Sequence, residues 1–291
     1  MLPPECLEAL DYTIWLGSEA HAGRLTHCSQ STICRRARQA TTIFKVRLSK
    51  VEGEWNTYPD SILLTLERQV HQLYRFASQK LLRLESDHWA GPQLLTALPE
   101  PWVHGRPGRV GIRRPMQLLR DRIIDAWITC TQADLPPTDD PTYATYVLAT
   151  TPLMMACASD HPLSGIGELT VGDLQQFPSL SVATHHYPNF AKQMQAKGAW
   201  NTPQTMQHYS YERWEAQALH NLYTLPINTL SNPLANSGLQ PLDFNLSIND
   251  CIALVMRRDI SELPEVQRLR EHLQQQLHAL ALKNPLLSAL N

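Results

Sequence analysis

The chain has 291 residues, of which 43% are hydrophobic and 18% are charged, and its formal net charge at pH 7 is −2. This length allows two domains with separate cores, and the composition excludes a disordered chain. No stretch approaches the ~18 consecutive apolar residues of a membrane span, and the N-terminus lacks the basic start and apolar run of a secretory signal, so we expect a cytoplasmic globular protein.

The first sixty residues have the spacing of a helix-turn-helix with a wing. Apolar residues recur at helical intervals over residues 5–15, a short second helix is expected over 19–25, and Ser29 is placed to cap a third helix over about 30–44. In this motif the last helix enters the major groove of DNA. The stretch 46–58 alternates around Gly53 and is expected to form a small hairpin beside the helices.

The basic residues are concentrated in this region. No acidic residue lies between Ala20 and Val51, so these 32 residues carry +7 while the remaining 259 carry −9. Arginine pairs with guanine and glutamine with adenine, short hydroxyl side chains reach phosphates or base edges, and the remaining cations suit phosphates. The expected DNA contacts are Ser29, Gln30, Ser31, Thr32, Arg35, Arg36, Arg38, Lys45, Arg47 and Lys50. An ordinary basic surface helix is the alternative.

A helix of about twenty residues is expected next, over 60–80. Its apolar residues Leu63, Leu66, Val70 and Leu73 alternate at spacings of three and four, which suits packing against a second copy of the same helix. Such a dimer would present two recognition helices to two half-sites of an operator. Packing of this helix on its own chain is the alternative.

Strands and helices alternate in the rest of the chain. Strands are expected at 81–86, 109–114 and 126–131, with a helix over 116–126, and the chain closes with a strand-rich stretch at 244–260 and an amphipathic helix over 263–280. This alternation predicts an α/β domain with a parallel sheet.

Several of these segments resemble the LysR-type transcriptional regulators. The N-terminal match covers Gly17-Ser18, Ala22, the run SQSTI at 29–33, Arg35 and the VRL at 46–48, and "IIDAWIT", "PLMMACASDHPLS" and "LVMRRD" resemble segments of the effector domain of that family. The resemblance implies a bacterial winged helix-turn-helix regulator with a long linker helix. It also implies a two-lobed α/β effector-binding domain of periplasmic-binding-protein type.

The implied domains are a DNA-binding domain over 1–58, a linker and dimerisation helix over 59–81, and an effector-binding domain over 82–291. Lobe I would comprise about 82–150 and 250–291, and lobe II about 151–249. The resemblance further implies double-stranded DNA, a small-molecule effector and a dimer or a tetramer made of two dimers, with RNA polymerase as a candidate partner. It implies no cofactor.

In such a fold the effector lies between the lobes, at strand ends and helix N-termini where free backbone N–H groups favour anions. The matching residues are Ser86, Asp87, Thr129, Thr131, Thr184, His185 and His186. Each of them is also what an ordinary cap or loop contains, and Asp87 would oppose an anion.

The sequence shows no pattern for catalysis or metal binding. The glycine-rich nucleotide loops and the G-x-S-x-G elbow are missing, and no carboxylate lies at ligand spacing from the adjacent histidines. The six cysteines have no C-x-x-C pair and are expected to be reduced and mostly buried, with a redox-sensing cysteine as the alternative. A small-molecule sensor that has lost DNA binding is the other function consistent with the sequence.

Overall fold

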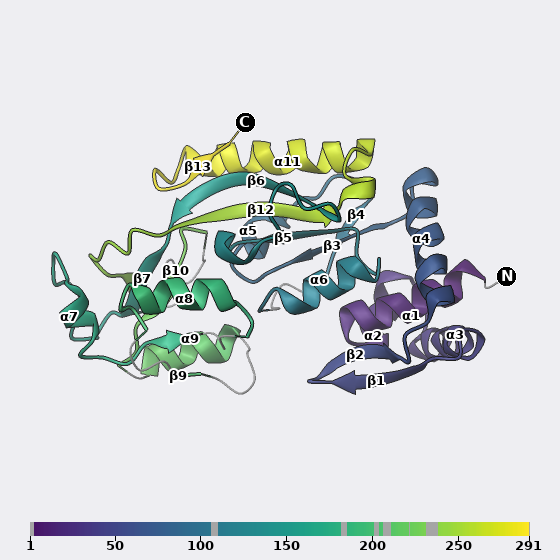
Figure 1. The fold of residues 1–291 in the computed structure, drawn as a ribbon, viewed down its shortest axis with the longest axis horizontal. Coiled ribbons are helices and arrows are strands. Elements are labelled where there is room, and N and C mark those ends of the chain that lie inside the picture. Colours follow the sequence, from purple (N-terminus) through teal and green to yellow (C-terminus); the bar gives the residue numbers. More distant parts are fainter. Residues whose placement is uncertain are drawn as a thin grey trace. The chain divides into compact units, whose positions relative to one another are not determined.

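The computed structural model describes residues 3–105, 110–181, 185–200, 204–205, 211–220, 222–230 and 238–290 (Figure 1). The chain forms two compact units: unit 1 comprises Met1–Glu85, Glu100–Arg106 and Pro115–Ala126, and unit 2 comprises Ser86–Pro99, Pro107–Arg114 and Trp127–Asn291. None of the helices described has the length and hydropathy needed to cross a membrane. The domain boundaries expected from the sequence stay a prediction.

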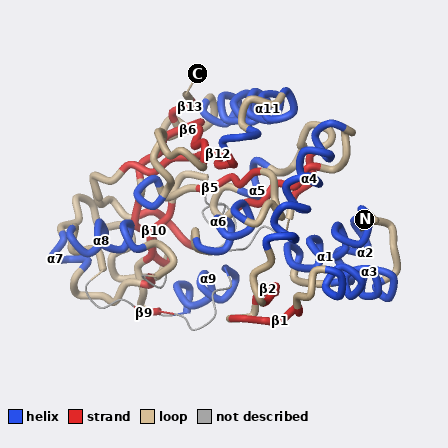
Figure 2. Tube along the Cα trace, turned by 45° about the vertical axis from the view of Figure 1, so that its right-hand side comes forward, coloured by secondary structure: helices blue, strands red, loops and turns tan. Residues whose placement is uncertain are grey.

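Unit 1 begins with the expected winged helix-turn-helix. Its elements are α1 (Pro4–Leu16), α2 (Glu19–Leu25), α3 (Gln30–Ile43), β1 (Arg47–Val51) and β2 (Glu54–Tyr58). The two strands pair antiparallel, and Figure 2 shows this hairpin near the three helices. The turn after α2 depends on Gly23, because a Cβ there would lie 2.5 Å from the carbonyl oxygen of Cys28.

The remaining elements of unit 1 correct one expectation. They are α4 (Ile62–Ala77), β3 (Leu82–Ser86), β4 (Trp102–His104) and most of α6 (Arg113–Arg120). The strand expected at 109–114 is wrong, since the described part of that segment has no strand and Arg113 begins α6. The parallel partner of β3 is β4, a strand that was not predicted from the sequence. Pro115 is compatible with the first turn of α6, where backbone N–H groups lack helical acceptors.

Charged residues fill part of the interior of unit 1. Asp11 of α1 is 1% exposed and pairs with Arg68 of α4, whose Nη2 lies 2.8 Å from Oδ1. Arg83 of β3 is fully buried, with Nη1 3.6 Å from Asp11 Oδ2 and its guanidinium 4.3 Å from the ring centre of Tyr12. Because Asp11 contacts two arginines, this cluster ties α1, α4 and β3 together by charge.

A second buried cluster surrounds Asp125. Arg75 of α4 approaches it with two nitrogens, Nη2 at 2.7 Å from Oδ1 and Nε at 3.3 Å from Oδ2. The Gln72 amide donates to Oδ1 at 3.0 Å, and the backbone N–H of Arg83 donates to Oδ2 at 2.9 Å. Both carboxylate oxygens of Asp125 are therefore satisfied, because each accepts one charge-assisted hydrogen bond from Arg75 and one further hydrogen bond.

Unit 2 contains the two sheets that position the pocket described below. Four strands lie in the order β13 (Ser288–Ala289), β6 (Tyr143–Pro152), β12 (Asn249–Arg257) and β5 (Ala126–Thr129), with β6 antiparallel to both β12 and β13. A second sheet has the order β10 (Leu225–Ile227), β7 (Met154–Ala158) and β11 (Leu239–Pro241), in which β7 is antiparallel to both neighbours. The short strands β8 (Leu180–Ser181) and β9 (Gln204–Thr205) pair in parallel. The expected parallel pairing is therefore found for β8 and β9, whereas the strands around β6 and β7 pair antiparallel, so the pairing in this unit is mixed.

The strands of unit 2 are β5 (Ala126–Thr129), β6 (Tyr143–Pro152), β7 (Met154–Ala158), β8 (Leu180–Ser181), β9 (Gln204–Thr205), β10 (Leu225–Ile227), β11 (Leu239–Pro241), β12 (Asn249–Arg257) and β13 (Ser288–Ala289). The helices are α5 (Gly91–Leu94), η1 (Gln132–Asp134), α7 (Val171–Leu174), α8 (Pro188–Ala196), α9 (Tyr211–His220), η2 (Arg258–Ile260) and α11 (Pro264–Ala281). The expected amphipathic helix is α11, which runs alongside β6 in Figure 1 and buries Leu269, Leu273 and Leu277.

Candidate functional site

Ser29 starts α3 as the sequence predicts. Its Oγ accepts a hydrogen bond from the backbone N–H of Thr32 at 3.2 Å, which satisfies one of the first four unpaired N–H groups of the helix. The apolar residues Ile33, Ala37 and Ala40 of α3 are buried, so the opposite face of the helix is exposed. The cap and the buried stripe together fix which residues of α3 face solvent.

The exposed face of α3 carries unpaired positive charge. Arg35 and Arg38 are exposed, and so is Lys45 just after the helix. Among the residues described, none of the three has a carboxylate within 4.0 Å. Arg36 lies differently, because it is half-buried and its Nη1 donates to Cys28 Sγ at 3.4 Å. The structure thus separates two adjacent arginines that the sequence placed together.

Two further predicted contacts are held on the wing by aromatic rings. The Arg47 guanidinium lies 5.1 Å from the ring centre of Tyr58, and the Lys50 ammonium lies 4.9 Å from the ring of Trp55. Cation–π contacts of this kind limit the motion of the side chains and leave their charge accessible. Ser29, Gln30 and Ser31 are exposed and Thr32 is half-exposed at the start of α3. The predicted DNA-contact residues therefore lie on α3, just after it and on the wing.

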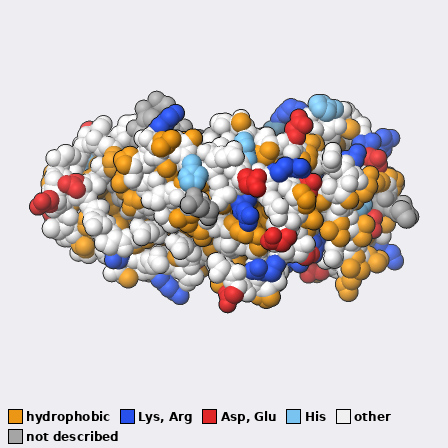
Figure 3. Space-filling view, turned by 90° about the horizontal axis from the view of Figure 1, so that it is seen from above, with side chains coloured by type: hydrophobic (Ala, Val, Ile, Leu, Met, Phe, Trp, Pro, Cys, Tyr) orange, Lys and Arg blue, Asp and Glu red, His pale blue; other side chains and the backbone are white. Residues whose placement is uncertain are grey.

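The predicted dimerisation residues form an exposed apolar face on α4. Leu63, Leu66, Val70 and Leu73 are between 46% and 67% exposed, and Ile62 is 80% exposed. Figure 3 shows hydrophobic side chains gathered at its right-hand end, the end at which α4 lies in Figure 1. The buried face of the same helix carries Arg68 and Arg75 of the charged clusters. Apolar side chains therefore face solvent while charged side chains lie in the interior.

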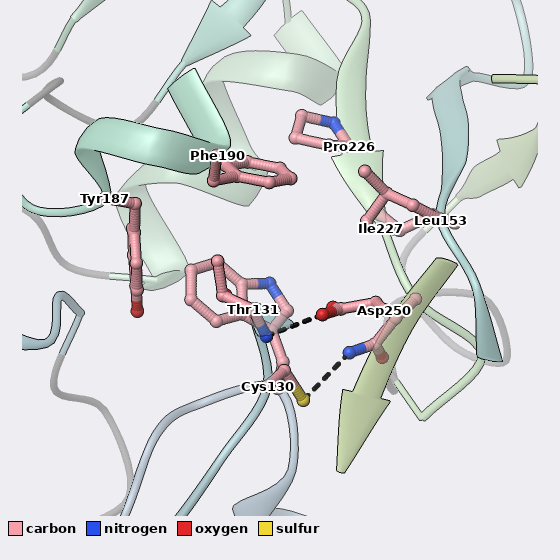
Figure 4. A pocket seen from close by; sticks show the side chains of 10 residues that line it. Cys130, Thr131, Leu153, Tyr187, Phe190, Pro226, Ile227 and Asp250 are labelled. Atoms are coloured by element: carbon pink, nitrogen blue, oxygen red, sulfur yellow. Dashed lines mark hydrogen bonds between the residues drawn. The ribbon is translucent and has the colours of Figure 1, made fainter. Parts of the chain in front are cut away.

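Unit 2 contains a pocket with about 360 Å³ of space free of atoms, part of it open to solvent. Its apolar walls are Trp89, Leu153, Tyr187, Phe190, Pro226 and Ile227, and its polar lining is Cys130, Thr131, Asn228 and Asp250. In Figure 4 Phe190 and Pro226 lie across the pocket from Cys130 and Thr131. These residues come from segments predicted for both lobes, so the pocket lies where the two predicted lobes would meet.

Asp250 is the charged residue of this lining. It is the second residue of β12, is 6% exposed, and accepts three backbone hydrogen bonds through Oδ1 alone. Burial raises its pKa from 3.8 to about 6, backbone hydrogen bonds oppose this rise, and the nearby Asp87 adds to it. Sequence reasoning missed Asp250, although it named Thr131, whose backbone N–H donates to it at 2.6 Å.

Thr131 has a strained backbone. Its φ of 75° and ψ of 65° lie in the left-handed region, where a β-branched residue is an outlier. Hydrogen bonds from the N–H groups of Thr131 and Gln132 to Asp250 hold this conformation. Such strain costs about 1–3 kcal/mol and persists where the surroundings over-determine it, often at functional sites.

Of the other predicted effector residues, the five that the structure describes do not line the pocket. Ser86, Asp87 and Thr129 are buried, and both oxygens of Asp87 accept from the protein: Oδ1 from Ala90 N, and Oδ2 from Thr129 Oγ1 and Cys130 N. His185 is exposed and His186 half-buried. Thr184 lies outside the described residues. As effector contacts these six stay a prediction.

The described residues contain no cluster of three or more His, Cys, Asp or Glu side chains able to hold a metal ion. A winged helix-turn-helix with an unpaired basic face, on the same chain as an α/β unit with a ligand-sized pocket, defines the class of ligand-responsive DNA-binding proteins.

Comparisons with known proteins specify the family within this class. The family model described as LysR substrate binding domain matches residues 110–278, more than half of the chain. The chain belongs to the LysR-type transcriptional regulators, whose members bind DNA and respond to effectors. No curated protein matches the sequence.

Solved structures of LysR-type regulators are similar over almost the whole chain. A full-length OxyR variant from Pseudomonas aeruginosa has a TM-score of 0.56 at 16% identity, covering 94% of this chain and 95% of that chain. An H2O2-bound OxyR mutant from Corynebacterium glutamicum has a TM-score of 0.52 at 17% identity, covering 98% of both chains. Full-length CbnR in complex with its target DNA has a TM-score of 0.55 at 14% identity, covering 94% of this chain and 99% of that chain. At these identities the likeness shows the fold.

Proposed function

We propose that the protein is a sequence-specific transcriptional regulator whose α3 reads the major groove and whose unit 2 pocket binds the controlling effector. The observation that carries the DNA-binding part is the unpaired basic face of α3, where Arg35 and Arg38 are exposed without a carboxylate partner in the described chain. The structure of CbnR with its target DNA supports the same role for this fold. DNA as the partner implies action in the cytoplasm.

In this proposal α4 forms the dimer through its exposed apolar face, and two dimers form a tetramer on DNA. Exposed leucines at 46–67% accessibility would be covered by a second copy of the helix. RNA polymerase is a candidate partner at the promoter. Effector binding would control transcription only if it favours one assembly state over another, because a ligand shifts an equilibrium by its differential affinity.

Reversible ligand binding is favoured over oxidation of Cys130 or Cys157 as the signal. The OxyR mutant bound to H2O2 raises the oxidative alternative. Oxidation requires a thiolate, whereas burial, Asp87 and Asp250 raise the pKa of the Cys130 thiol well above its ordinary value. Burial likewise raises the pKa of Cys157, to about 11. Neither thiol is activated for reaction with a peroxide.

The test is DNA binding by the purified full-length chain to a pool of fragments from its own genome, followed by sequencing of the retained fragments. On the operator recovered, Arg35→Ala should cost about 1–3 kcal/mol and leave affinity for random DNA nearly unchanged. Lys50→Ala should weaken binding to both and reduce the salt dependence by about one phosphate contact.

The matched control is Arg120→Ala, which removes an exposed arginine of unit 1 outside the winged helix-turn-helix and should change neither affinity. Equal losses on operator and random DNA for Arg35→Ala would contradict base recognition by α3. Retention of no fragment even at low salt would favour the alternative, a sensor that has lost DNA binding.

A further inference from the structure

Asp250 presents an unused carboxylate oxygen at the pocket. All three of its hydrogen bonds go to Oδ1, from the backbone N–H groups of Thr131 at 2.6 Å, Gln132 at 3.1 Å and Cys251 at 2.9 Å. Within the described chain Oδ2 accepts none, although the residue is 94% buried and lines the pocket. Because Asp250 lines the pocket and its Oδ2 accepts no hydrogen bond from the described chain, a donor group of a ligand can pair with this oxygen.

The same hydrogen bonds remove the donors that an anion would need. Backbone N–H groups at the end of one strand and the start of a short helix commonly hold anionic ligands. Here the N–H groups of Thr131 and Gln132 already bind the protein's own carboxylate. The expectation that such positions favour an anionic effector is therefore not met in this pocket.

Electrostatics around Asp250 also favour a positive ligand. None of the described lining residues is a lysine or arginine. The nearby buried carboxylate of Asp87 adds negative charge, and it raises the pKa of Asp250 in addition to the larger effect of burial. Tyr187 contributes no charge, because burial raises its pKa well above the ordinary value. An anion entering here would be repelled, whereas a cation would be attracted.

The rings opposite this carboxylate can accept a cation or the apolar body attached to it. Trp89 and Tyr187 have ring centres 6.0 Å apart at 62°, and Tyr187 and Phe190 are 6.5 Å apart at 79°. These edge-to-face contacts hold the three rings in defined orientations around the pocket. Aromatic faces attract ammonium groups, most strongly where water is excluded.

We propose that the pocket takes a small organic cation, whose ammonium group pairs with Asp250 Oδ2 and whose apolar body packs against Trp89, Tyr187 and Phe190. The role of this ligand as the effector rests on the proposed function, whereas its binding does not. Thr131 holds Asp250 in position through its strained backbone. The pocket is thus selective for charge through one carboxylate and for shape through three rings.

Calorimetric titration of the purified full-length protein at pH 8 tests the proposal with three probes of similar skeleton: 2-phenylethylammonium, 2-phenylethanol and 3-phenylpropionate. The ammonium should bind about 10- to 100-fold more tightly than the alcohol, since a hydrogen bond to a charged group is the one added interaction. The carboxylate should bind more weakly than the alcohol. Equal binding of alcohol and ammonium, preferential binding of the carboxylate, or no binding by any probe would overturn the proposal.

Asp250→Asn is the informative variant, because an amide oxygen can accept the same three backbone hydrogen bonds without the charge. It should lose about 10-fold or more in ammonium affinity and leave alcohol affinity within about twofold. The matched control is Asp173→Asn in the cap of α7, outside the pocket, which should leave the affinities for all three probes unchanged. Unchanged ammonium binding by Asp250→Asn would contradict the assignment.

Operator binding measured on the same samples separates this inference from the proposed function. Ammonium binding with no operator binding at all would retain the ligand class and reject the regulator. Operator binding that the ammonium leaves unchanged would retain the ligand class and reject its role as effector. Operator binding together with failure of every probe would retain the regulator and reject the ligand class.

Discussion

Asp125 in unit 1 and Asp250 in unit 2 are both buried carboxylates, with exposures of 0% and 6%, but their partners differ. Asp125 meets the guanidinium of Arg75, the amide of Gln72 and a backbone N–H, which satisfy both of its oxygens. Asp250 meets backbone N–H groups on one oxygen only, and none of the described residues that line the pocket with it is a lysine or arginine. The first arrangement satisfies both oxygens and holds α4 to β3, whereas the second leaves Oδ2 of Asp250 without a hydrogen bond from the described chain.

This difference separates structural from functional buried charge. A buried ion pair contributes little net stability, but loss of one partner leaves a charge that nothing compensates. A buried carboxylate that lacks a cation carries this cost in the native protein. Asp250 is therefore maintained at the expense of stability, as is common for binding and catalytic groups.

The largest effect on stability is expected when the buried pair between Arg75 and Asp125 is broken. Arg75→Met should lower the free energy of unfolding by about 3–5 kcal/mol, because Asp125 would remain buried and charged without its arginine. Urea unfolding at pH 7.5 measures it. Adding Asp125→Asn to this variant should recover part of the loss, since no unpaired charge then remains.

Arg120→Met is the control, since its side chain is 64% exposed beside Asp121 and exposed pairs contribute at most about 1 kcal/mol. Equal losses for Arg75→Met and Arg120→Met would show that the buried pair has no structural role.

The second-largest expected effect is an increase in stability. Asp250→Asn should raise the free energy of unfolding at pH 8 by about 3 kcal/mol, because it removes an ionised group whose pKa is raised from 3.8 to about 6. A carboxyl whose pKa is higher in the folded state binds more protons there. The wild type should therefore lose this stability as the pH rises from about 4 through 6, and the variant should not.

Urea unfolding of both proteins at several pH values between 4 and 8 checks this prediction. The gap between them should be near zero at pH 4 and widest above pH 7. Other carboxyl groups titrate in both proteins and cancel in the difference, apart from Asp87, which lies close enough to be coupled. A variant less stable than the wild type at pH 8 would show that Asp250 is structural, as Asp125 is.

The smallest effect on stability is expected on the outer face of α4. Leu66→Gln should change the free energy of unfolding of the monomer by less than about 0.5 kcal/mol, because Leu66 is 53% exposed. It should weaken self-association at least about tenfold if that face forms the dimer. Sedimentation at several protein concentrations measures this, with Thr65→Gln as the exposed control on the same helix. Equal self-association of both variants would exclude this face from the dimer.

Local patterns in the sequence predicted α1 to α4 closely, whereas the helix expected over 116–126 begins earlier and ends at Arg120 as α6. Ser29 caps α3, Gly17 and Ser18 separate α1 from α2, and the alternation around Gly53 forms the β1–β2 hairpin. The outer apolar residues of α4 were also identified. Its buried polar face was not, because Arg68 and Arg75 match the pattern of a solvated helix face until the positions of Asp11 and Asp125 are known.

The pocket was predicted less well, for a topological reason. A parallel sheet places the carboxyl ends of its strands at one edge, so the predicted effector contacts were residues that follow β3, β5 and β8. In the sheet of unit 2 the beginning of β12 meets the end of β5, which brings Asp250 to Thr131. An acidic residue at the start of a buried strand is the signal that could have identified it.

The sequence by itself determined the winged helix-turn-helix, its basic face, the linker helix and the α/β character of the rest, because periodicity, caps and local charge act over a few residues. The tertiary structure alone decided which buried charges are paired, which arginine of Arg35 and Arg36 faces solvent, and which carboxylate reaches the pocket. Asp11 meets Arg68, and Asp250 meets Thr131, across 57 and 119 positions of the chain. The pairing of such distant groups depends on strand order and direction, which no local pattern encodes.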